Sequence, residues 1–506
     1  MATNKLLCSF RIIGVFSIML ICALSANAQF LRTSYFMEGT HYRQQLNPAL
    51  TPTKGYFNLP VIGALNASVS STSLGYQDIL DIIDDDGEFY KNQDFLGRLK
   101  NNNTLNLNFN TEILSAGWYK GKNFWTFNVG LRTDIGATVT KSLFEFLNEV
   151  DEISEWNNQN FNIGGQEVNI QAYTEVGLGL SRQINDRLTV GAKVKALLGI
   201  GNMNLKISQA YMKAKLPTET RINEIANTQL GSNWESEIAN LKTEISDYNA
   251  DLRVDATLES SFKGLELLKN DDGYVDDLDF DAGKAGIAGW GLGFDLGASY
   301  KIMDNLTVSA SILDLGFLTW SKNSTQIATA NGGVDMKGED YVKKLESATS
   351  LEEAQNAIRD FGNESQDFLN RASGGDVLDF DLLQMTTEQA AKSRKSRLAA
   401  TLVLGAEYGF FNNKLAVGGL YTTRFVQPKA MTELTFSANY RPKSWFNVAL
   451  SYSVIQSAGK SFGLGLKLGP VFLGTDYMFL GKNSNSVNGF VGVSIPLGGR
   501  KVSKQG

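Results

Sequence analysis

The stretch Leu188-Thr189-Val190-Gly191-Ala192-Lys193-Val194-Lys195-Ala196-Leu197-Leu198 decides the fold of this chain. Apolar side chains occupy every second position from Leu188 to Leu198, and small, polar or charged residues stand at most of the positions between them. Successive side chains of a β-strand point to opposite faces, so the stretch predicts a strand with one apolar and one largely polar face. The same alternation recurs along the chain, for example at 290–299, 446–454 and 487–497.

Soluble antiparallel sheets also alternate, so strand length and the character of the polar face must separate soluble from membrane sheets. Many of the predicted strands run about 11–16 residues, whereas soluble strands are typically about five or six and a tilted strand needs about 9–11 to cross a bilayer. Their polar faces are rich in Gly, Ser, Thr and Asn, which is typical of a wet barrel lumen. Aromatic residues cluster near strand ends, as interfacial girdles do: Trp118, Tyr119, Trp125, Trp290, Trp320, Tyr408, Tyr440 and Trp445.

The connections alternate between tight turns and long excursions, which is typical of outer-membrane barrels. We therefore predict an all-β fold, a transmembrane antiparallel β-barrel of about 14 strands over residues 61–497. Its long extracellular loops are 72–103, 138–167, 203–285 and 321–395. The predicted strands lie near 63–71, 104–119, 123–137, 168–183, 187–202, 286–301, 305–320, 396–411, 413–425, 430–441, 444–455, 461–469, 471–480 and 485–497, and the segments 160–167, 204–211 and 252–262 could add or lengthen strands.

Two of the long loops are predicted to be partly helical. Apolar residues recur at three- to five-residue spacing in 219–250 and again in 339–371, a pattern that indicates amphipathic helices. Two interpretations of these apolar stripes are open. They either pack the loop helices together over the barrel mouth, or they form a surface for a partner or a ligand.

Residues 1–28 have the features of a cleaved secretion signal. A positively charged start is followed by an apolar run, and Ala26-Asn27-Ala28 fits the small-x-small cleavage pattern. The apolar run is shorter than the roughly 20 residues that a membrane-spanning helix needs. Both cysteines, Cys8 and Cys22, lie in this segment, so the exported chain relies on no disulfide. We expect the mature protein to lie in the cell outer membrane, in contact with its lipid, with a carboxyl-terminal tail at 498–506.

The sequence contains no arrangement that indicates an enzyme. Its single histidine, His41, excludes a two-His zinc site and has no nucleophile motif near it. The acidic runs at 84–88 and 271–281 lack the spacing of a calcium-binding loop, so solvated acidic loops are the simpler interpretation. A formal net charge of −6 gives no electrostatic reason to expect nucleic acid as a partner. We expect no catalytic residues, no cofactor and no metal.

The alternation also predicts which charged side chains face the lumen. A lipid-facing Arg or Lys would cost roughly 2–4 kcal/mol at mid-bilayer, whereas opposite charges inside can pair across strands. We expect most of this set to hold barrel and plug together, and Arg132, Lys193, Lys195 and Arg424 are the candidates for contact with a carboxylate-bearing ligand. The predicted lumen-facing charges are Arg132, Asp134, Glu175, Lys193, Lys195, Asp295, Glu407, Arg424, Glu433, Lys467 and Asp476.

Two stretches of the sequence resemble a known family. Residues 30–60, with Gln45-Leu46-Asn47-Pro48-Ala49-Leu50 at their centre, and the stretch Asp314–Trp320 resemble Bacteroidetes outer-membrane β-barrel proteins that are grouped only as a domain of unknown function. The resemblance covers essentially the whole mature chain. It implies an outer-membrane barrel and leaves the biochemistry open.

The triplet Asn47-Pro48-Ala49 lies just before the first predicted strand, within an amino-terminal segment at 29–60. It is similar to the triplet in the hatch that plugs FadL-type long-chain fatty acid transporter barrels, which implies passive, selective uptake of hydrophobic or amphipathic small molecules. Accessory barrels of type IX secretion also carry an early Asn-Pro-Ala, and Asn-Pro can simply initiate a turn. The alternative function is therefore a non-transporting barrel that acts with a partner protein in surface assembly or secretion.

Overall fold

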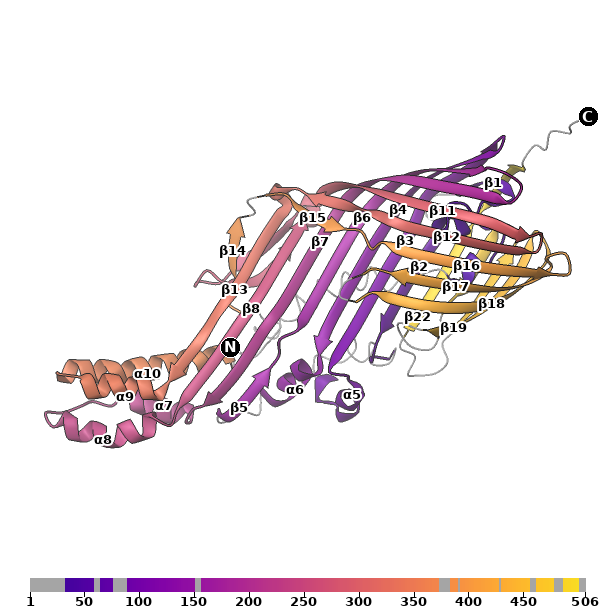
Figure 1. The fold of residues 1–506 in the computed structure, drawn as a ribbon. Coiled ribbons are helices and arrows are strands. Elements are labelled where there is room, and N and C mark those ends of the chain that lie inside the picture. The colour runs from indigo at the N-terminus through magenta and orange to yellow at the C-terminus, as the bar shows by residue number, and fades with distance from the viewer. Residues whose placement is uncertain are drawn as a thin grey trace, which may run out of the picture.

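The structure is a computed structural model that describes residues 32–58, 64–75, 89–150, 156–372, 383–389, 392–426, 429–455, 461–476 and 486–499. The predicted secretion signal and most of the predicted tail lie outside the described residues. A closed antiparallel β-barrel makes up most of this part of the chain (Figure 1). From one side of the barrel, several long strands continue well past the others and end in a group of helices.

The barrel wall has 14 strand positions, as the sequence predicts. Neighbouring strands follow chain order, and the first position closes on the last because β2 pairs with β22 and β1 pairs with β23. The strands, with those that share one position joined by a plus sign, are β1 (Lys54–Asn58) + β2 (Ala64–Ser71), β3 (Asn102–Lys120), β4 (Asn123–Thr140), β6 (Gln166–Gln183), β7 (Leu188–Lys215), β11 (Gly289–Met303), β12 (Leu306–Trp320), β15 (Arg394–Arg397) + β16 (Thr401–Phe410), β17 (Leu415–Arg424), β18 (Met431–Lys443), β19 (Phe446–Ile455), β20 (Ser461–Leu468), β21 (Val471–Thr475) and β22 (Ser486–Val493) + β23 (Ile495–Gly499).

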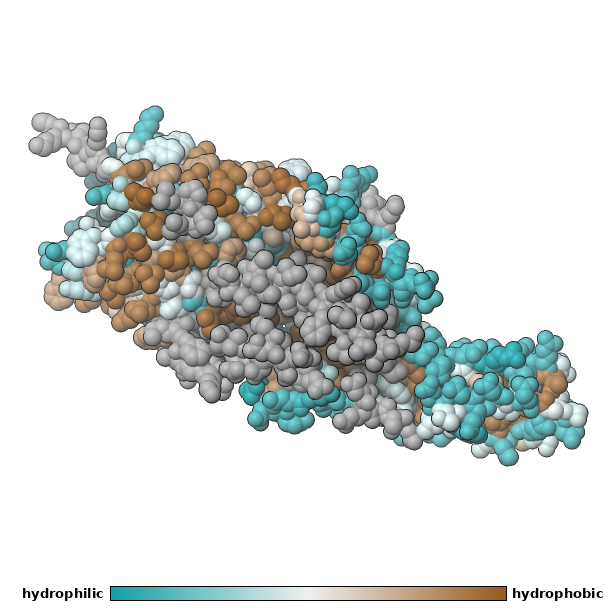
Figure 2. Space-filling model, turned by 180° about the vertical axis from the view of Figure 1, so that it is seen from behind, coloured by the Kyte–Doolittle hydropathy of each residue, from teal (hydrophilic) through white to brown (hydrophobic). Residues whose placement is uncertain are grey.

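The wall has the predicted alternation of faces. In β7, Val190, Val194 and Leu198 are exposed on the outside, whereas Lys193 and Lys195 between them are buried in the lumen. Large hydrophobic residues cover much of the outside of the barrel (Figure 2). They include Leu178, Trp290, Leu292, Phe294, Leu296, Leu404, Val417, Phe436, Leu450, Leu473 and Val491.

The first wall position corrects one predicted boundary. Residues 54–58 were assigned to the amino-terminal segment at 29–60, but they form strand β1, which pairs with β3 on one side and β23 on the other. These five residues are part of the wall because their backbone groups complete the ladder that closes the barrel. Strand β23 also runs to Gly499, two residues past the predicted end of the barrel.

A β-bulge in β12 makes another prediction wrong. Trp320 was predicted for the aromatic girdle, but its side chain is 0% exposed, and its indole N–H donates to the hydroxyl of Ser396 at 2.9 Å. Asp314 has a φ of 54°, and the register with β11 shifts at this point. The extra residue reverses the alternation, since Leu313 faces inward before the bulge and Leu318 and Trp320 face inward after it.

The loops contain more strand than the sequence predicts. Strand β7 continues to Lys215 and pairs there with β5 (Asn157–Asn162) and β8 (Asn249–Phe262), so the three open segments at 160–167, 204–211 and 252–262 include strand. Next to β8 lies β13 (Thr325–Lys337), which was assigned to loop because Asn331-Gly332-Gly333 weakens its strand pattern. The sheet ends with β14 (Thr386–Gln389), and β9 (Leu265–Lys269) pairs with β10 (Val275–Phe280) as a separate hairpin.

The predicted helices in the two large loops are confirmed. They are α7 (Glu219–Ala226), α8 (Trp234–Ile245), α9 (Gly338–Ser347) and α10 (Leu351–Ala372), which lie at the far end of the extended sheet (Figure 1). The loops also contain helices that were not predicted, namely η1 (Phe89–Lys91), α5 (Gln93–Arg98), α6 (Lys141–Val150), η2 (Ala282–Lys284) and η3 (Lys322–Ser324). Among the described helices, none is both long and apolar enough to span a membrane.

The apolar stripes of the loop helices pack inside the loops. One cluster joins them to the inner face of the extended sheet, which accounts for the stripes by packing and not by an exposed partner surface. The stripe residues in this cluster are Ile222, Ile225, Leu230, Ile238, Ile245, Tyr341, Leu345, Ala354, Ile358, Phe361 and Phe368.

Candidate functional site

Residues 32–50, which we call the lumen segment, lie inside the barrel. The segment contains two one-turn helices, α2 (Arg32–Tyr35) and α3 (Arg43–Leu46), and its side chains Tyr35, Phe36 and Met37 are almost fully buried. A segment of this length cannot form a core of its own, so the wall supplies its packing partners. These partners come from six strands and are Leu313, Val403, Leu420, Ala449, Phe472 and Phe490.

Glycines of the wall make room for the lumen segment. A Cβ atom added at Gly191 of β7 would come within 2.5 Å of the carbonyl carbon of Pro48. A Cβ atom added at Gly297 of β11 would overlap the side-chain oxygen of Asn47. Because real Cβ atoms do not approach other atoms so closely, the glycines at these two positions fit the wall to the segment that fills it.

The Asn47-Pro48-Ala49 triplet is bonded to several strands of the wall. The side-chain amide of Asn47 donates to the carbonyl oxygens of Ala298 in β11 and Ala310 in β12, both at 3.2 Å. Its side-chain oxygen accepts from the backbone N–H of Ala49 at 2.9 Å, which is the local turn that Asn-Pro favours. The hydroxyl of Ser181 in β6 donates to the carbonyl of Pro48. The triplet therefore forms a turn and also fixes that turn against three strands.

An ion pair holds the start of the lumen segment. The guanidinium of Arg32 lies 2.6 Å from the carboxylate of Glu433 in β18, and it donates to two serine hydroxyls of the wall at 2.9 Å. The backbone N–H of Thr33 donates to the carboxylate of Asp476 at 2.6 Å. Two of the predicted lumen-facing charges, Glu433 and Asp476, thus bind the segment directly.

Charged contacts also hold the middle of the lumen segment. Glu38 lies 3.2 Å from Arg441 in β18, whose guanidinium also donates to Glu407 at 2.8 Å. The amine of Lys467 donates to the carbonyl of Gly39 at 3.2 Å. The predicted charges Glu407 and Lys467 therefore lie at this contact, one through Arg441 and the other directly.

The single histidine of the chain is part of the same contact surface. Its Nε2 atom lies 2.8 Å from the carboxylate of Glu112 in β3 and 2.8 Å from the amide nitrogen of Asn58. The imidazole of His41 stacks on Tyr56, with ring centroids 4.8 Å apart. His41 therefore binds the lumen segment to the first two wall positions.

A second group of charges lies in the lumen beside the lumen segment. Lys195 of β7 is 2.8 Å from Asp295, 2.6 Å from Asp314 and 3.9 Å from Glu175. Arg132 of β4 lies 3.2 Å from Glu175. Three carboxylates and two cations therefore form one largely buried network, in which Asp314 and Arg132 are partly exposed, and we call it the central network.

One ion pair crosses the lumen. Arg424 belongs to β17 and Asp134 to β4, and their side chains meet at 2.6 Å although five of the 14 wall positions lie between the two strands. Such a pair joins nearly opposite sides of the wall and narrows the passage between them. It provides a second obstruction besides the lumen segment.

All eleven predicted lumen-facing charges lie on the inside of the wall. Arg132, Lys195 and Arg424, which were candidates for a ligand carboxylate, have protein carboxylates as partners, and Lys193 is buried beside the central network.

The prediction missed charges of the lumen segment, because one-turn helices show no strand alternation. It missed Asp314 because the bulge changes the face of that residue. The missed titratable residues are Arg32, Glu38, His41, Glu112, Asp314 and Arg441.

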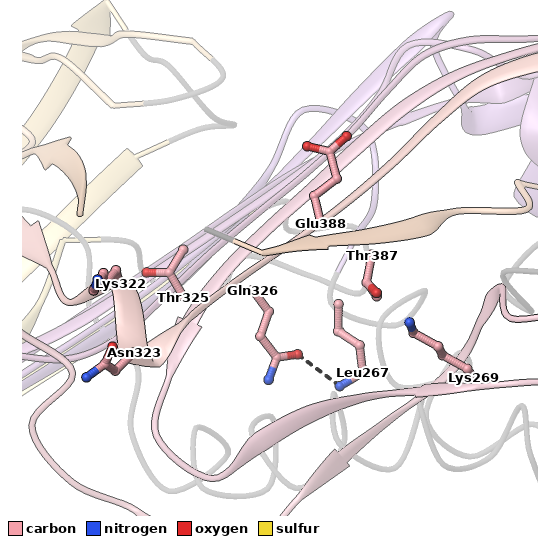
Figure 3. Close-up of a pocket in the computed structure, with 8 residues that line it drawn as sticks. All are labelled: Leu267, Lys269, Lys322, Asn323, Thr325, Gln326, Thr387 and Glu388. Carbon is pink, nitrogen blue, oxygen red and sulfur yellow. Dashed lines mark hydrogen bonds between the residues drawn. The ribbon is translucent and has the colours of Figure 1, made fainter. Parts of the chain in front are cut away.

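A polar cavity of about 690 Å³ lies among the long loops (Figure 3). Strand β13 and helix η3 provide one side, and β9 and β14 provide the rest. Within it, the side-chain oxygen of Gln326 accepts from the backbone N–H of Leu267 at 3.0 Å. The lining residues are Leu267, Lys269, Lys322, Asn323, Thr325, Gln326, Thr387 and Glu388, of which only Leu267 is apolar. In the described part of the chain, no group of three or more His, Cys, Asp or Glu side chains is arranged to hold a metal ion.

Comparisons with known proteins identify a family and similar barrels. Residues 48–476 match the model of a family of unknown function (DUF5723). No curated protein matches the sequence. Among solved structures, the Pseudomonas putida toluene transporter TodX is 13% identical with a TM-score of 0.36, over 90% of this chain and 93% of that chain. The Ralstonia pickettii toluene transporter TbuX gives 11% and 0.38 over 90% and 93%, and a Pseudomonas aeruginosa FadL homologue gives 10% and 0.36 over 90% and 94%.

Proposed function

The chain belongs to this family of unknown function, and we propose that it is an outer-membrane barrel for the passive, gated uptake of hydrophobic or amphipathic small molecules. One observation carries the proposal. The lumen of a closed barrel is filled by a segment of the same chain that the wall holds through individual hydrogen bonds and ion pairs. Such a segment can move or rearrange without unfolding the wall, as a plug does.

The membrane location rests on the outer surface of the barrel. Large apolar side chains are exposed over much of the outside, whereas the eleven charged side chains predicted for the lumen lie on the inner face. Exposed apolar surface of this extent is unfavourable in water and favourable against lipid. Between the barrel and the helices at the end of the extended sheet, the surface changes from mainly hydrophobic to mainly hydrophilic (Figure 2).

A charge placed in the apolar band tests the membrane location. Leu404 of β16 and Leu351 of α10 are both 42% exposed, but only Leu404 lies on the outside of the barrel. We expect L404R to destabilise the barrel in a bilayer by roughly 2–4 kcal/mol, because lipid cannot solvate the guanidinium. We expect L351R to change stability by less than about 0.5 kcal/mol, as surface substitutions usually do. Urea-dependent gel migration of barrels folded into vesicles measures both, and equal effects would contradict the location.

The apolar character of the proposed ligand rests on the surroundings of the barrel mouth. The inner face of the extended sheet and the loop helices form one apolar cluster on the loop side of the barrel. These side chains are buried against one another, so a hydrophobic molecule would contact them only when the loop helices move apart. The polar cavity among the loops can hold the polar end of an amphipathic molecule.

Uptake by intact cells tests the function. We expect cells that produce the barrel to take up radiolabelled oleate or toluene faster than cells that lack it, with saturation at high ligand concentration. A cavity-lining variant, K269Q/K322Q, should weaken uptake of oleate more than uptake of toluene, because only oleate carries a carboxylate. The proposal would be contradicted if, for each probe, cells with verified levels of folded barrel took up no more than cells without the barrel.

A second candidate function is a partner in surface assembly or secretion. The helices α7–α10 and the ends of β7, β8 and β13 project from the barrel as a lobe with a hydrophilic surface (Figures 1 and 2). Such a lobe is available for a partner protein. Purification of the intact barrel distinguishes the two functions, since a stoichiometric protein would favour assembly and a lipid-like molecule would favour uptake.

A further inference from the structure

Lys395 and Arg397 lie on the outer face of the barrel near its loop end. Strand β15 pairs with the end of β12, so that Lys395 lies opposite Thr319 and Arg397 lies opposite Phe317. The intervening residues, Arg394 and Ser396, point inward, where Arg394 lies 3.0 Å from Glu259 and Ser396 accepts from Trp320. Because neighbouring residues of a strand face opposite sides, Lys395 and Arg397 point outward, and both are exposed.

These two cations stand at the rim of the apolar band. The amine of Lys395 lies 5.5 Å from the ring centroid of the exposed Phe317. Trp290 of β11, which is 58% exposed, lies across from Thr319 in the neighbouring pairing. Aromatic side chains at the end of an apolar wall mark the level of lipid headgroups. The two cations are therefore placed where headgroups begin.

The outward cations have no acidic partner on the described part of the chain. No described carboxylate lies within 4.0 Å of Lys395 or Arg397. Other cations of the region do have such partners, as Arg394 has Glu259 and Lys284 has Glu266. Two exposed basic side chains without a carboxylate partner in the described part of the chain create a positive surface next to exposed hydrophobic residues.

We propose that this corner binds the phosphorylated headgroup of an anionic glycolipid in the outer leaflet. The proposal rests on the membrane location given above and not on uptake. A guanidinium binds phosphate through two parallel hydrogen bonds, and an ammonium adds a compact charge. The acyl chains of the same molecule lie along the apolar band below, where Leu315 and Phe294 are exposed. A lipid brings both the anionic group and the apolar chains that this surface complements.

Lipid binding to the purified barrel in detergent tests the proposal. The probe is bisphosphorylated lipid A, and its binding is measured by native mass spectrometry over a concentration series. We expect K395Q/R397Q to bind roughly 10- to 30-fold more weakly, since each basic residue near a membrane surface contributes about 1 kcal/mol. The control K206Q/K213Q removes two exposed lysines from the extension of β7, away from the apolar band, and should bind as the wild type does.

Two further measurements identify which part of the lipid the barrel recognises. Lipid A without phosphates should bind at least about tenfold more weakly than the bisphosphorylated form, because the charge contacts are lost. Inorganic phosphate at millimolar concentration should not displace the lipid. Unchanged binding by K395Q/R397Q, equal binding of the dephosphorylated lipid, or displacement by inorganic phosphate would each overturn the proposal. Because none of these measurements involves uptake, a failed uptake assay would leave this result unaffected.

Discussion

A barrel that lacks residues 32–50 is expected to conduct ions as an open pore. The lumen segment fills the barrel between β12, β16, β17, β19, β21 and β22, and its removal takes away every side chain that packs there from the amino terminus. The deletion leaves β1 intact, since that strand begins at Lys54 and closes the wall. In planar-bilayer recording, we expect the intact chain to be nearly silent and the deletion to raise conductance roughly tenfold or more, although a 14-strand barrel remains narrower than an open porin.

Two controls keep the deletion interpretable. Heat-modifiable gel migration must first show that the shortened chain still folds as a barrel. The variant R32Q/E433Q keeps the whole segment but removes the ion pair at its start, so it should give brief openings and not a steady pore. Removal of the ion pair that crosses the lumen, by R424Q in the deletion background, should raise the conductance further. A steady large conductance of the intact chain, or a silent folded deletion, would contradict a plug.

The wall could be predicted from the sequence because each strand carries a repeated signal. Lys193 and Lys195 stand between apolar residues of β7, and the period of two places them inside without knowledge of any contact. The bulge at Asp314 could not be predicted, since a single extra residue leaves no trace in composition and yet turns Trp320 from the lipid to the lumen. Strand β13 was missed because Asn331-Gly332-Gly333 lowers its strand propensity, while pairing with β8 stabilises it.

The site could be predicted only in part. Eleven charges on or beside strands were found, but Glu112, Asp314 and Arg441 on other strand positions were missed. The partners of the charges were not predicted either, because pairing depends on which strands meet across the lumen. Arg424 and Asp134 are 290 residues apart in sequence and belong to strands that do not pair. The contacts of the lumen segment could not be predicted, because its one-turn helices have no periodicity and its partners are spread over the wall. The triplet Asn47-Pro48-Ala49 was noticed through a resemblance, and its bonds to three strands were not predictable from three residues.

Replacing Lys195 by methionine should be among the most damaging single changes in the wall. The amine of Lys195 lies within 4.0 Å of Glu175, Asp295 and Asp314, and its side chain is almost fully buried. Without it, the buried Glu175 and Asp295 and the partly exposed Asp314 keep only Arg132 as a cation in direct contact with the network. Loss of one partner of a buried ion pair typically costs about 3–5 kcal/mol, because the remaining charge has neither water nor a counter-ion. The midpoint of urea unfolding in vesicles, followed by gel migration, should fall accordingly.

Comparison with neighbouring variants separates the lost charge from the lost side chain. Lys193 is the matched control, since it is a buried lysine two residues earlier in β7 and has no described carboxylate within 4.0 Å. K193M should therefore destabilise the barrel by less than K195M does. The double variant K195M/D295N removes the cation together with the carboxylate at 2.8 Å, so it should recover part of the loss, with a coupling of roughly 0.5–3 kcal/mol. The central network does not stabilise the wall through its charges if K195M and K193M lower the free energy of unfolding equally and the double variant recovers none of that loss. Its side chains would then contribute through packing alone.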